Sequence, residues 1–127
     1  MEFVRVYPIG LLAPRAARHS LDLLIGLVRP APLMDLRVIV SEFVTNSVRH
    51  AGQHDGDPIT VRVDCTEARV RIEVEDGGPG FTPVFPRPDP ERDSRWGLYL
   101  VDRLADRWGT GPSGRVWAEV DLSPQPG

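Results

Sequence analysis

Two neighbouring segments with strict alternation of apolar and polar residues constrain the fold of this chain most. Their apolar members are Ile59, Val61, Val63 and Cys65 in the first segment and Val70, Ile72 and Val74 in the second. Such alternation puts one side of a strand in the core and the other side in water. Because only residues 66–68 separate the two segments, we expect an antiparallel hairpin.

Two segments before this hairpin have the spacing of helices. Residues 14–28 begin with proline, which suits the first turn of a helix, and carry apolar side chains every three or four residues. These side chains are Ala17, Leu21, Leu24 and Val28. After a break at 29–32, we expect a second helix over 33–51, ending just before Gly52.

Residues 77–96 have a different composition, with five prolines and three glycines. A loop of this length in a small domain is typically a lid or a binding loop. We expect a helix after it at 97–105, a turn at 109–114 and a strand at 116–122.

The expected elements form one domain over residues 1–127, with a further short strand at 3–6 and a frayed tail at 123–127. Helices interleave with half-buried strands along the chain. The fold class that follows is α/β (α+β), a two-layer sandwich with a mixed, mostly antiparallel sheet covered on one face by helices.

Composition excludes several classes of function. All fifteen basic residues are arginine, so a P-loop, a eukaryotic-type protein kinase and a pyridoxal enzyme are excluded, because each needs a lysine. The net charge of -3 argues against direct nucleic-acid binding. The sequence has no apolar run long enough to cross a membrane and no signal-peptide layout, so we expect a cytoplasmic protein without membrane partners.

Glu42, Asn46 and His50 follow one another at intervals of four residues and share a polar face of the helix expected over 33–51. An amide oxygen such as that of Asn46 can bind Mg²⁺, which otherwise takes waters and phosphate oxygens. A carboxylate one turn earlier can accept a proton from an attacking hydroxyl or water. Taken alone, the pattern also fits a solvated helix face.

A second segment begins where the hairpin ends. Asp76 closes the second strand, and Gly78 and Gly80 let the backbone after it approach a ligand closely. A carboxylate at the base of a pocket can accept a hydrogen bond from an adenine amino group. Taken alone, the segment also fits a turn rich in glycine and proline.

A third segment follows the long loop. Gly97 is expected to open the last helix, with Leu98 next to it, and free backbone N–H groups at a helix start bind phosphate. Arg92 and Arg95 lie just before this helix and can reach phosphate oxygens. An ordinary helix start has the same pattern.

The order of these segments is more specific than any one of them. The four motifs are SEFVTNSVRHAG (41–52), VEDGGPGF (74–81), WGLYLVDRLADRWG (96–109) and RVWAEVDL (115–122). With them the chain resembles the histidine-kinase-like (GHKL) ATPase superfamily, whose ATP-binding domain has the Bergerat fold. Within it, the likeness is greatest to anti-sigma-factor serine kinases of the SpoIIAB and RsbW type.

The resemblance implies a role for each matching residue. Glu42 would be the general base, and Asn46 would bind Mg²⁺. The remaining implied binding residues are Asp76, Gly78 and Gly80 on the adenine side, and Gly97 and Leu98 at the phosphate end beneath the lid. Two positions depart from the family pattern: Arg95 stands where the family has the first glycine of its second glycine box, and Arg115 where it often has a threonine.

The resemblance also implies a function and partners. We expect an ATP- and Mg²⁺-dependent serine/threonine kinase that phosphorylates an anti-sigma-factor antagonist, with a sigma factor as a second partner that it sequesters. We also expect a homodimer formed through the first strand and helix. A non-catalytic module that binds nucleotide to regulate a protein is the main alternative. A metal-dependent hydrolase is a third, although His19, His50 and His54 lack metal-ligand spacing.

Overall fold

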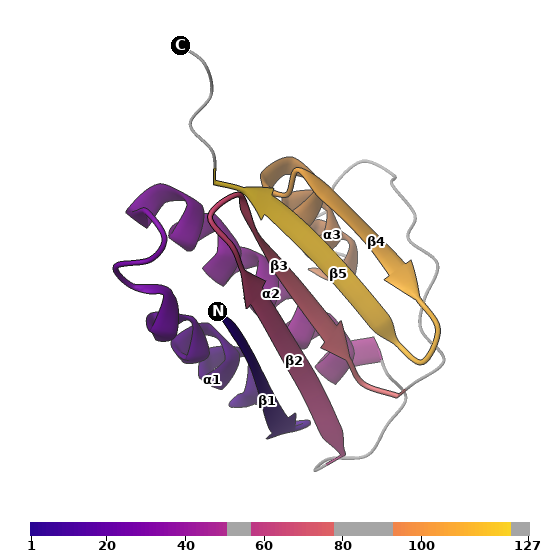
Figure 1. Ribbon diagram of the computed structural model, residues 1–127. Helices are drawn as coiled ribbons and strands as arrows, with labels where there is room; N and C mark the ends of the chain where they lie inside the picture. Colours follow the sequence, from indigo (N-terminus) through magenta and orange to yellow (C-terminus); the bar gives the residue numbers. More distant parts are fainter. Residues whose placement is uncertain (51–56, 78–92, 123–127) are drawn as a thin grey trace.

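A five-stranded sheet and three α-helices make up the fold (Figure 1). The structure is a computed structural model that describes residues 1–50, 57–77 and 93–122. Along the chain the elements are β1 (Glu2–Pro8), α1 (Ala13–Ser20), the 3-10 helix η1 (Leu21–Leu24), α2 (Pro30–His50), β2 (Pro58–Cys65), β3 (Arg69–Glu75), α3 (Asp93–Leu104), β4 (Arg107–Gly111) and β5 (Arg115–Asp121).

The strands are arranged in the order β1-β2-β3-β5-β4, and each neighbouring pair is antiparallel. The predicted hairpin is confirmed as β2 and β3, with Val63 opposite Ile72 and Cys65 opposite Val70. The Oγ1 of Thr66 closes its turn by accepting hydrogen bonds from the backbone N–H groups of Ala68 and Arg69, both at 3.2 Å. The expected antiparallel character of the sheet is therefore confirmed.

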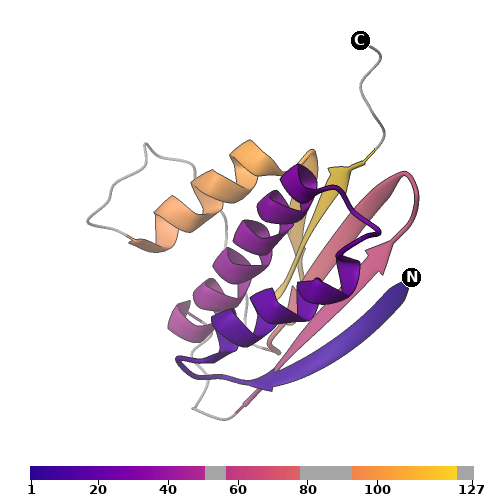
Figure 2. The ribbon, with the colours of Figure 1, turned by 90° about the vertical axis from the view of Figure 1, so that its left-hand side faces the viewer.

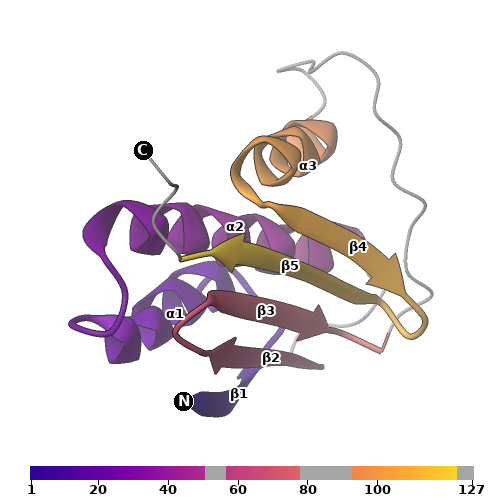
Figure 3. The ribbon, with the colours of Figure 1, turned by 45° about the horizontal axis from the view of Figure 1, so that its top comes forward.

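The helices all cover one face of the sheet, so the predicted two-layer architecture is confirmed (Figures 2 and 3). Helix α2 packs against β3 and β5, with α1 and α3 beside it, and α1 also contacts β1. The side chains of α2 that are fully buried in this layer are Leu36, Ile39, Val40, Phe43 and Val44. Among the described residues, no helix has both the length and the apolar character that a membrane crossing requires.

The opposite face of the sheet carries charged residues around Glu119 of β5. Its carboxylate accepts hydrogen bonds from Arg107 at 2.9 Å and Arg71 at 3.3 Å, and these arginines lower its pKa. Arg107 also pairs with Asp121. The guanidinium of Arg71 lies 4.4 Å from the centre of the Trp117 ring. This network of ion pairs lets the open face contact water without a second layer of helices.

The expected helix over 14–28 is only partly present. Helix α1 ends at Ser20, whose Oγ donates to the carbonyl of Ala17 at 2.6 Å, and η1 continues to Leu24. Gly26 then adopts a φ of 88°, which a side chain disfavours, so the helix cannot continue. The apolar spacing predicted correctly which residues are buried, namely Ala17, Leu21, Leu24 and Val28.

Three other boundaries differ from the prediction. Helix α2 begins at Pro30, because prolines are tolerated in the first turn, where N–H groups have no helical partner. Strand β1 spans Glu2–Pro8 and lies at an edge of the sheet. Helix α3 begins at Asp93, inside the segment 77–96 predicted as a lid. Pro90 is the last proline of that segment, so no proline prevents a helix from Asp93 onward.

Strand β4 was not predicted, because part of it was assigned to a turn at 109–114. Glycine is depleted in strands, and both Gly109 and Gly111 belong to this one. A Cβ added at Gly109 would lie 3.1 Å from the ring of Trp117, on the paired strand β5. Gly109 therefore allows the close approach of the Trp117 ring, and this cannot be recognised from local sequence.

The turn between β4 and β5 contains two residues in the left-handed region of backbone conformation. Ser113 and Gly114 have φ angles of 63° and 66°, and the N–H of Arg115 donates to the carbonyl of Pro112 at 3.3 Å. Two positive φ angles are typical of a type I′ hairpin turn, in which Asn-Gly is the favoured pair.

We therefore predict that Ser113→Asn raises the free energy of unfolding by about 0.5–1 kcal/mol, because asparagine tolerates positive φ better than serine. Ser113→Val should lower it by about 1–2 kcal/mol, since a β-branched residue is strained there. Urea unfolding of the three proteins tests this. A valine variant as stable as the wild type would contradict the turn geometry.

Candidate functional site

Helix α2 places Glu42 and Asn46 one turn apart in its C-terminal half. Between them, Phe43 and Val44 are fully buried in the core. Asn46 is itself only 4% exposed, while Glu42 is half-buried. The pair therefore does not lie on a solvated helix face, which was the alternative interpretation of this segment. The side chain of His50 lies outside the described residues.

The buried amide of Asn46 is incompletely hydrogen-bonded. Among the described residues, its Nδ2 has no hydrogen-bond partner. An unpartnered buried polar group costs about 1–3 kcal/mol, so a protein rarely keeps one without a use for it. Rotation of the amide by half a turn exchanges its oxygen and nitrogen, so the same position offers a ligand either a donor or an oxygen. This is the chemistry expected of a residue that binds Mg²⁺ or a phosphate.

Burial raises the pKa of the Glu42 carboxyl, and the positive charge of Arg49 opposes this shift in part. A carboxylate whose pKa moves toward neutral is a stronger proton acceptor than an ordinary surface glutamate. The preceding residue, Ser41, is held by Arg18 of α1, whose guanidinium donates to the Ser41 Oγ at 2.9 Å. Glu42 thus has the electrostatic environment of a general base.

Asp76 directly follows β3 and is partly buried. The next residue, Gly77, has a φ of 77° and donates its N–H to the carbonyl of Ser113 at 2.8 Å. The β4–β5 turn therefore supports the backbone next to Asp76. Gly77 was not among the predicted site residues, although an Asp-Gly pair at a strand end is a signal for a turn. The predicted Gly78 and Gly80 lie outside the described residues.

The prediction that Gly97 opens a helix is wrong, because Gly97 is the fifth residue of α3. The backbone N–H groups without helical partners belong to the first turn, at 93–96. Arg95 lies within that turn, and Arg92 lies outside the described residues. The side chain of Leu98 is buried, at 5% exposed. The structure does not describe the side chain of Arg95.

The elements that carry these residues converge at one end of the molecule. Helix α2 and strand β3 contact each other and run in the same direction, so their C-terminal ends lie at the same end of the molecule (Figure 1). The first turn of α3 lies on the same side as the end of α2 (Figure 2). The elements that carry Glu42, Asn46 and Asp76 therefore end on one side of the fold.

Arg115, the second departure from the family pattern, points to the open face of the sheet. It alternates with the buried Val116, and its Nε lies 3.2 Å from the Glu73 Oε1, although the two are not aligned for a hydrogen bond. This side chain therefore lies on the side of the sheet away from the helices.

Among the described residues, no group of three or more His, Cys, Asp or Glu side chains is arranged to hold a metal ion. A cation bound together with nucleotide phosphates needs only one or two protein ligands, and Asn46 can be one of them. Two cavities in the described part of the chain lie beside η1 and beside the β1–α1 connection, away from these residues.

Comparison with known protein families matches residues 14–116 to the histidine kinase-like ATPase domain. The match covers most of the chain, including α2, the β2–β3 hairpin and α3. The protein belongs to this family, and its α+β fold is the one expected for it.

Two curated relatives are the serine-protein kinases RsbW of Listeria innocua serovar 6a and Listeria monocytogenes serovar 1/2a. Each is 36% identical over 85 residues, a region that covers 57% of this chain and 54% of the relative. The chain thus matches about half the length of these relatives.

The raised pKa of Glu42 gives a prediction about stability. Because its folded-state pKa lies above the unfolded value of 4.5, the folded state binds more protons in the interval between the two. Stability from this group is fully present below pH 4.5 and is lost as pH rises through the folded pKa. Glu42→Gln stays neutral, so it should melt at a higher temperature than the wild type at pH 8 and at a similar temperature at pH 4. Glu67→Gln, in an exposed turn, should match the wild type at both. A wild type that melts above the glutamine variant at pH 8 would contradict the burial of Glu42.

The unpartnered amide of Asn46 gives a second prediction. Asn46→Leu has a similar volume and removes the polar group, so it should raise the free energy of unfolding of the nucleotide-free protein by about 1 kcal/mol. Chemical denaturation measures the change, with the buried Asn46→Ala as a cavity control that should be less stable than the leucine variant. A large loss of stability in Asn46→Leu would mean that the amide is already hydrogen-bonded.

Proposed function

We propose that this protein binds ATP with Mg²⁺ at the end of α2 and β3. The observation that carries the proposal is the buried Nδ2 of Asn46, which has no hydrogen-bond partner among the described residues and lies one turn from the half-buried Glu42. Membership of the histidine kinase-like ATPase family supports it. Neither the polar helix face nor the glycine-containing turn is specific alone, but the fold brings them together.

Each residue has a role in the proposed complex. Asp76 accepts a hydrogen bond from the adenine amino group, with Gly78 and Gly80 shaping that side of the pocket. Asn46 binds the Mg²⁺, which when bound offsets the negative charge that develops on the transferred phosphoryl group. The N–H groups of the first turn of α3 are placed to bind phosphate oxygens, near Arg95 and Leu98.

We further propose that the protein is a serine/threonine kinase, the activity that the names of its relatives state. Glu42 accepts the proton of the substrate hydroxyl while the hydroxyl oxygen bonds to the γ-phosphorus of ATP. The bond between that phosphorus and the β–γ bridging oxygen breaks, and ADP is released. Positioning of the reacting groups supplies most of the acceleration in such a reaction. The position of the Glu42 carboxylate therefore matters as much for the rate as its pKa does.

The proposed substrate is a small anti-sigma-factor antagonist, and a sigma factor is the proposed second partner. A homodimer through β1 and α1 also stays a prediction, and the position of β1 at an edge of the sheet is compatible with it. A module that binds nucleotide without phosphoryl transfer has the same pocket and differs only in the use of Glu42.

Calorimetric titration with Mg·ATP tests the nucleotide site. We expect saturable binding of Mg·ATP by the wild type. Asp76→Asn should not bind it, because the exchange of a carboxylate for an amide removes an acceptor that the adenine amino group needs. The wild type should not bind GTP, because guanine lacks that amino group at the same ring position. Asp64→Asn, on the exposed side of β2 near its far end, is the matched control and should bind as the wild type does. A wild type that binds no ATP would refute the proposal.

Transfer of radiolabelled phosphate from ATP to a purified antagonist protein tests the kinase step. Glu42→Gln should bind Mg·ATP but transfer phosphate about a hundredfold or more slowly, the usual contribution of a general base. Glu67→Gln serves as the control. Equal transfer by Glu42→Gln and the wild type would exclude Glu42 as the base. ATP binding without transfer by either would leave the non-catalytic module as the function.

A further inference from the structure

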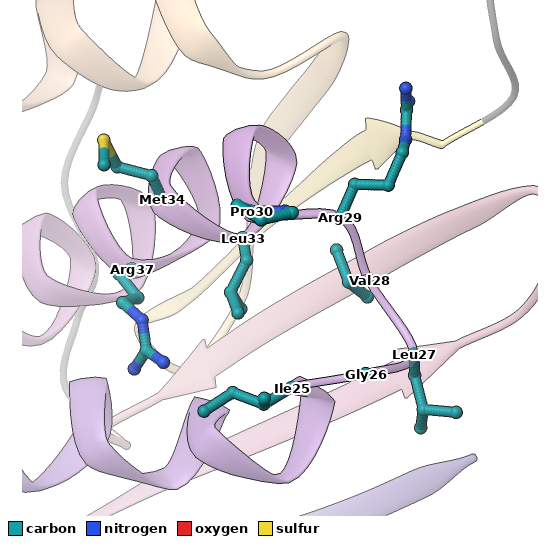
Figure 4. Close-up of a pocket in the computed structure, with 9 residues that line it drawn as sticks. All are labelled: Ile25, Gly26, Leu27, Val28, Arg29, Pro30, Leu33, Met34 and Arg37. Carbon is teal, nitrogen blue, oxygen red and sulfur yellow. The ribbon is translucent and has the colours of Figure 1, made fainter.

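A groove of about 670 Å³ lies between η1 and the start of α2 (Figure 4). Its lining consists of Ile25, Gly26, Leu27, Val28, Arg29, Pro30, Leu33, Met34 and Arg37. In Figure 4, Leu33 and Arg37 extend from α2 toward the side on which Ile25 lies. Arg37 is the lining residue nearest to Glu42 along α2, five residues or about 7.5 Å before it, and the lining contains none of the proposed nucleotide-site residues. The groove is therefore separate from the proposed nucleotide site.

Large apolar side chains at this groove face water. Ile25 is 64% exposed, Leu27 59% and Met34 68%. Clustered exposure of this kind is costly in a single chain and is typical of a surface that another molecule covers. The methionine adds to this, because its flexible side chain adapts to different partner surfaces.

The groove is held open by the local backbone. Gly26 has a φ of 88°, and the N–H groups of Ile25 and Leu27 donate to the carbonyls of Asp22 and Leu24 at 3.1 and 3.0 Å. Val28 beneath the groove is buried. Because these contacts fix the 25–29 segment, a ligand does not have to order the groove on binding.

The shape of the groove fits a helix. On α2, Pro30, Leu33, Met34 and Arg37 occupy positions i, i+3, i+4 and i+7, which form one stripe along a helix. The 25–29 segment forms the other wall. An open apolar channel beside a helical stripe is the geometry in which an amphipathic helix binds through its own i, i+3, i+4, i+7 side chains.

The charge around the groove selects the partner. The groove lining contains Arg29 and Arg37 and no carboxylate. Asp22 pairs with Arg37 at 2.9 Å, whereas Arg29 is exposed and donates one hydrogen bond, to the carbonyl of Leu122. Acidic residues on a partner complement this surface.

We propose that this groove binds an amphipathic helix of another protein, with apolar side chains against Ile25, Leu27 and Met34 and acidic residues beside Arg29. The groove does not depend on the nucleotide site, so its test is made without ATP. Failure of nucleotide binding and failure of helix binding are then separate results.

Selection from a displayed library of helix-forming peptides tests this proposal. Each peptide has leucine at i, i+3, i+4 and i+7, and its flanking positions vary among Glu, Lys, Ser and Ala. We expect the full-length protein to enrich peptides with flanking glutamates. Leu27→Ser and Met34→Ser should each weaken the best peptide about tenfold, because each removes a buried apolar contact. Arg29→Glu should shift the preference from glutamate toward lysine.

Leu11→Ser is the matched control, since Leu11 is 94% exposed but lies at the β1–α1 connection, and it should leave peptide affinity unchanged. Circular dichroism melting serves as the folding control. Each variant should melt as the wild type does, because the changed positions are exposed. Enrichment of lysine-flanked peptides, no enrichment at all, or equal weakening by Leu11→Ser would overturn the proposal. So would binding of octanoate in the groove without peptide binding, which identifies a small-molecule site, or self-association that Met34→Ser abolishes, which identifies a second copy as the occupant.

Discussion

The packing of α2 across β3 and β5 sets both the core and the geometry of the candidate site. Phe43 and Val44 are fully buried within the same turn that carries Glu42 and Asn46. Rotation of the helix to move Glu42 would pull Phe43 out of the core, and loss of a buried phenylalanine costs about 3–5 kcal/mol. Hydrophobic packing of the same helical turn therefore sets how far the carboxylate of the proposed base is buried.

Two arginines tie α1 to α2. Arg37 on α2 donates to the carbonyl of Arg18 at 2.8 Å, and Arg18 donates to Ser41 at 2.9 Å. Arg37 lines the groove, and Ser41 precedes Glu42. The proposed groove and the proposed nucleotide site thus use neighbouring stretches of one helix.

Strong local patterns predicted the fold well where burial alone decides structure. Period-two alternation gave the β2–β3 hairpin, since a shift of one residue would turn every valine outward. Strand β4 could not be predicted, because Gly109 belongs to a strand only through its contact with Trp117. The apolar spacing does not reveal the positive φ of Gly26, which follows η1 and interrupts the helix predicted over 14–28.

The candidate site shows the same division. The spacing of Glu42 and Asn46 on one helix follows from the sequence, but the burial of Asn46 depends on the surrounding layer of the fold. The contact from Gly77 to Ser113 joins residues far apart in the chain, and no local signal announces it. The prediction that Gly97 opens a helix was wrong, because α3 begins four residues earlier and continues through this glycine.

The arginine network on the open face of the sheet has a consequence for behaviour in acid. Its arginines lower the pKa of Glu119, whereas burial raises the pKa of Glu42. As the solution is acidified, Glu42 takes up its proton first, while the ion pairs of the sheet are still intact. On the proposed mechanism, mild acid therefore neutralises the proposed base while the ion pairs around Glu119 remain, and a return to neutral pH restores its charge.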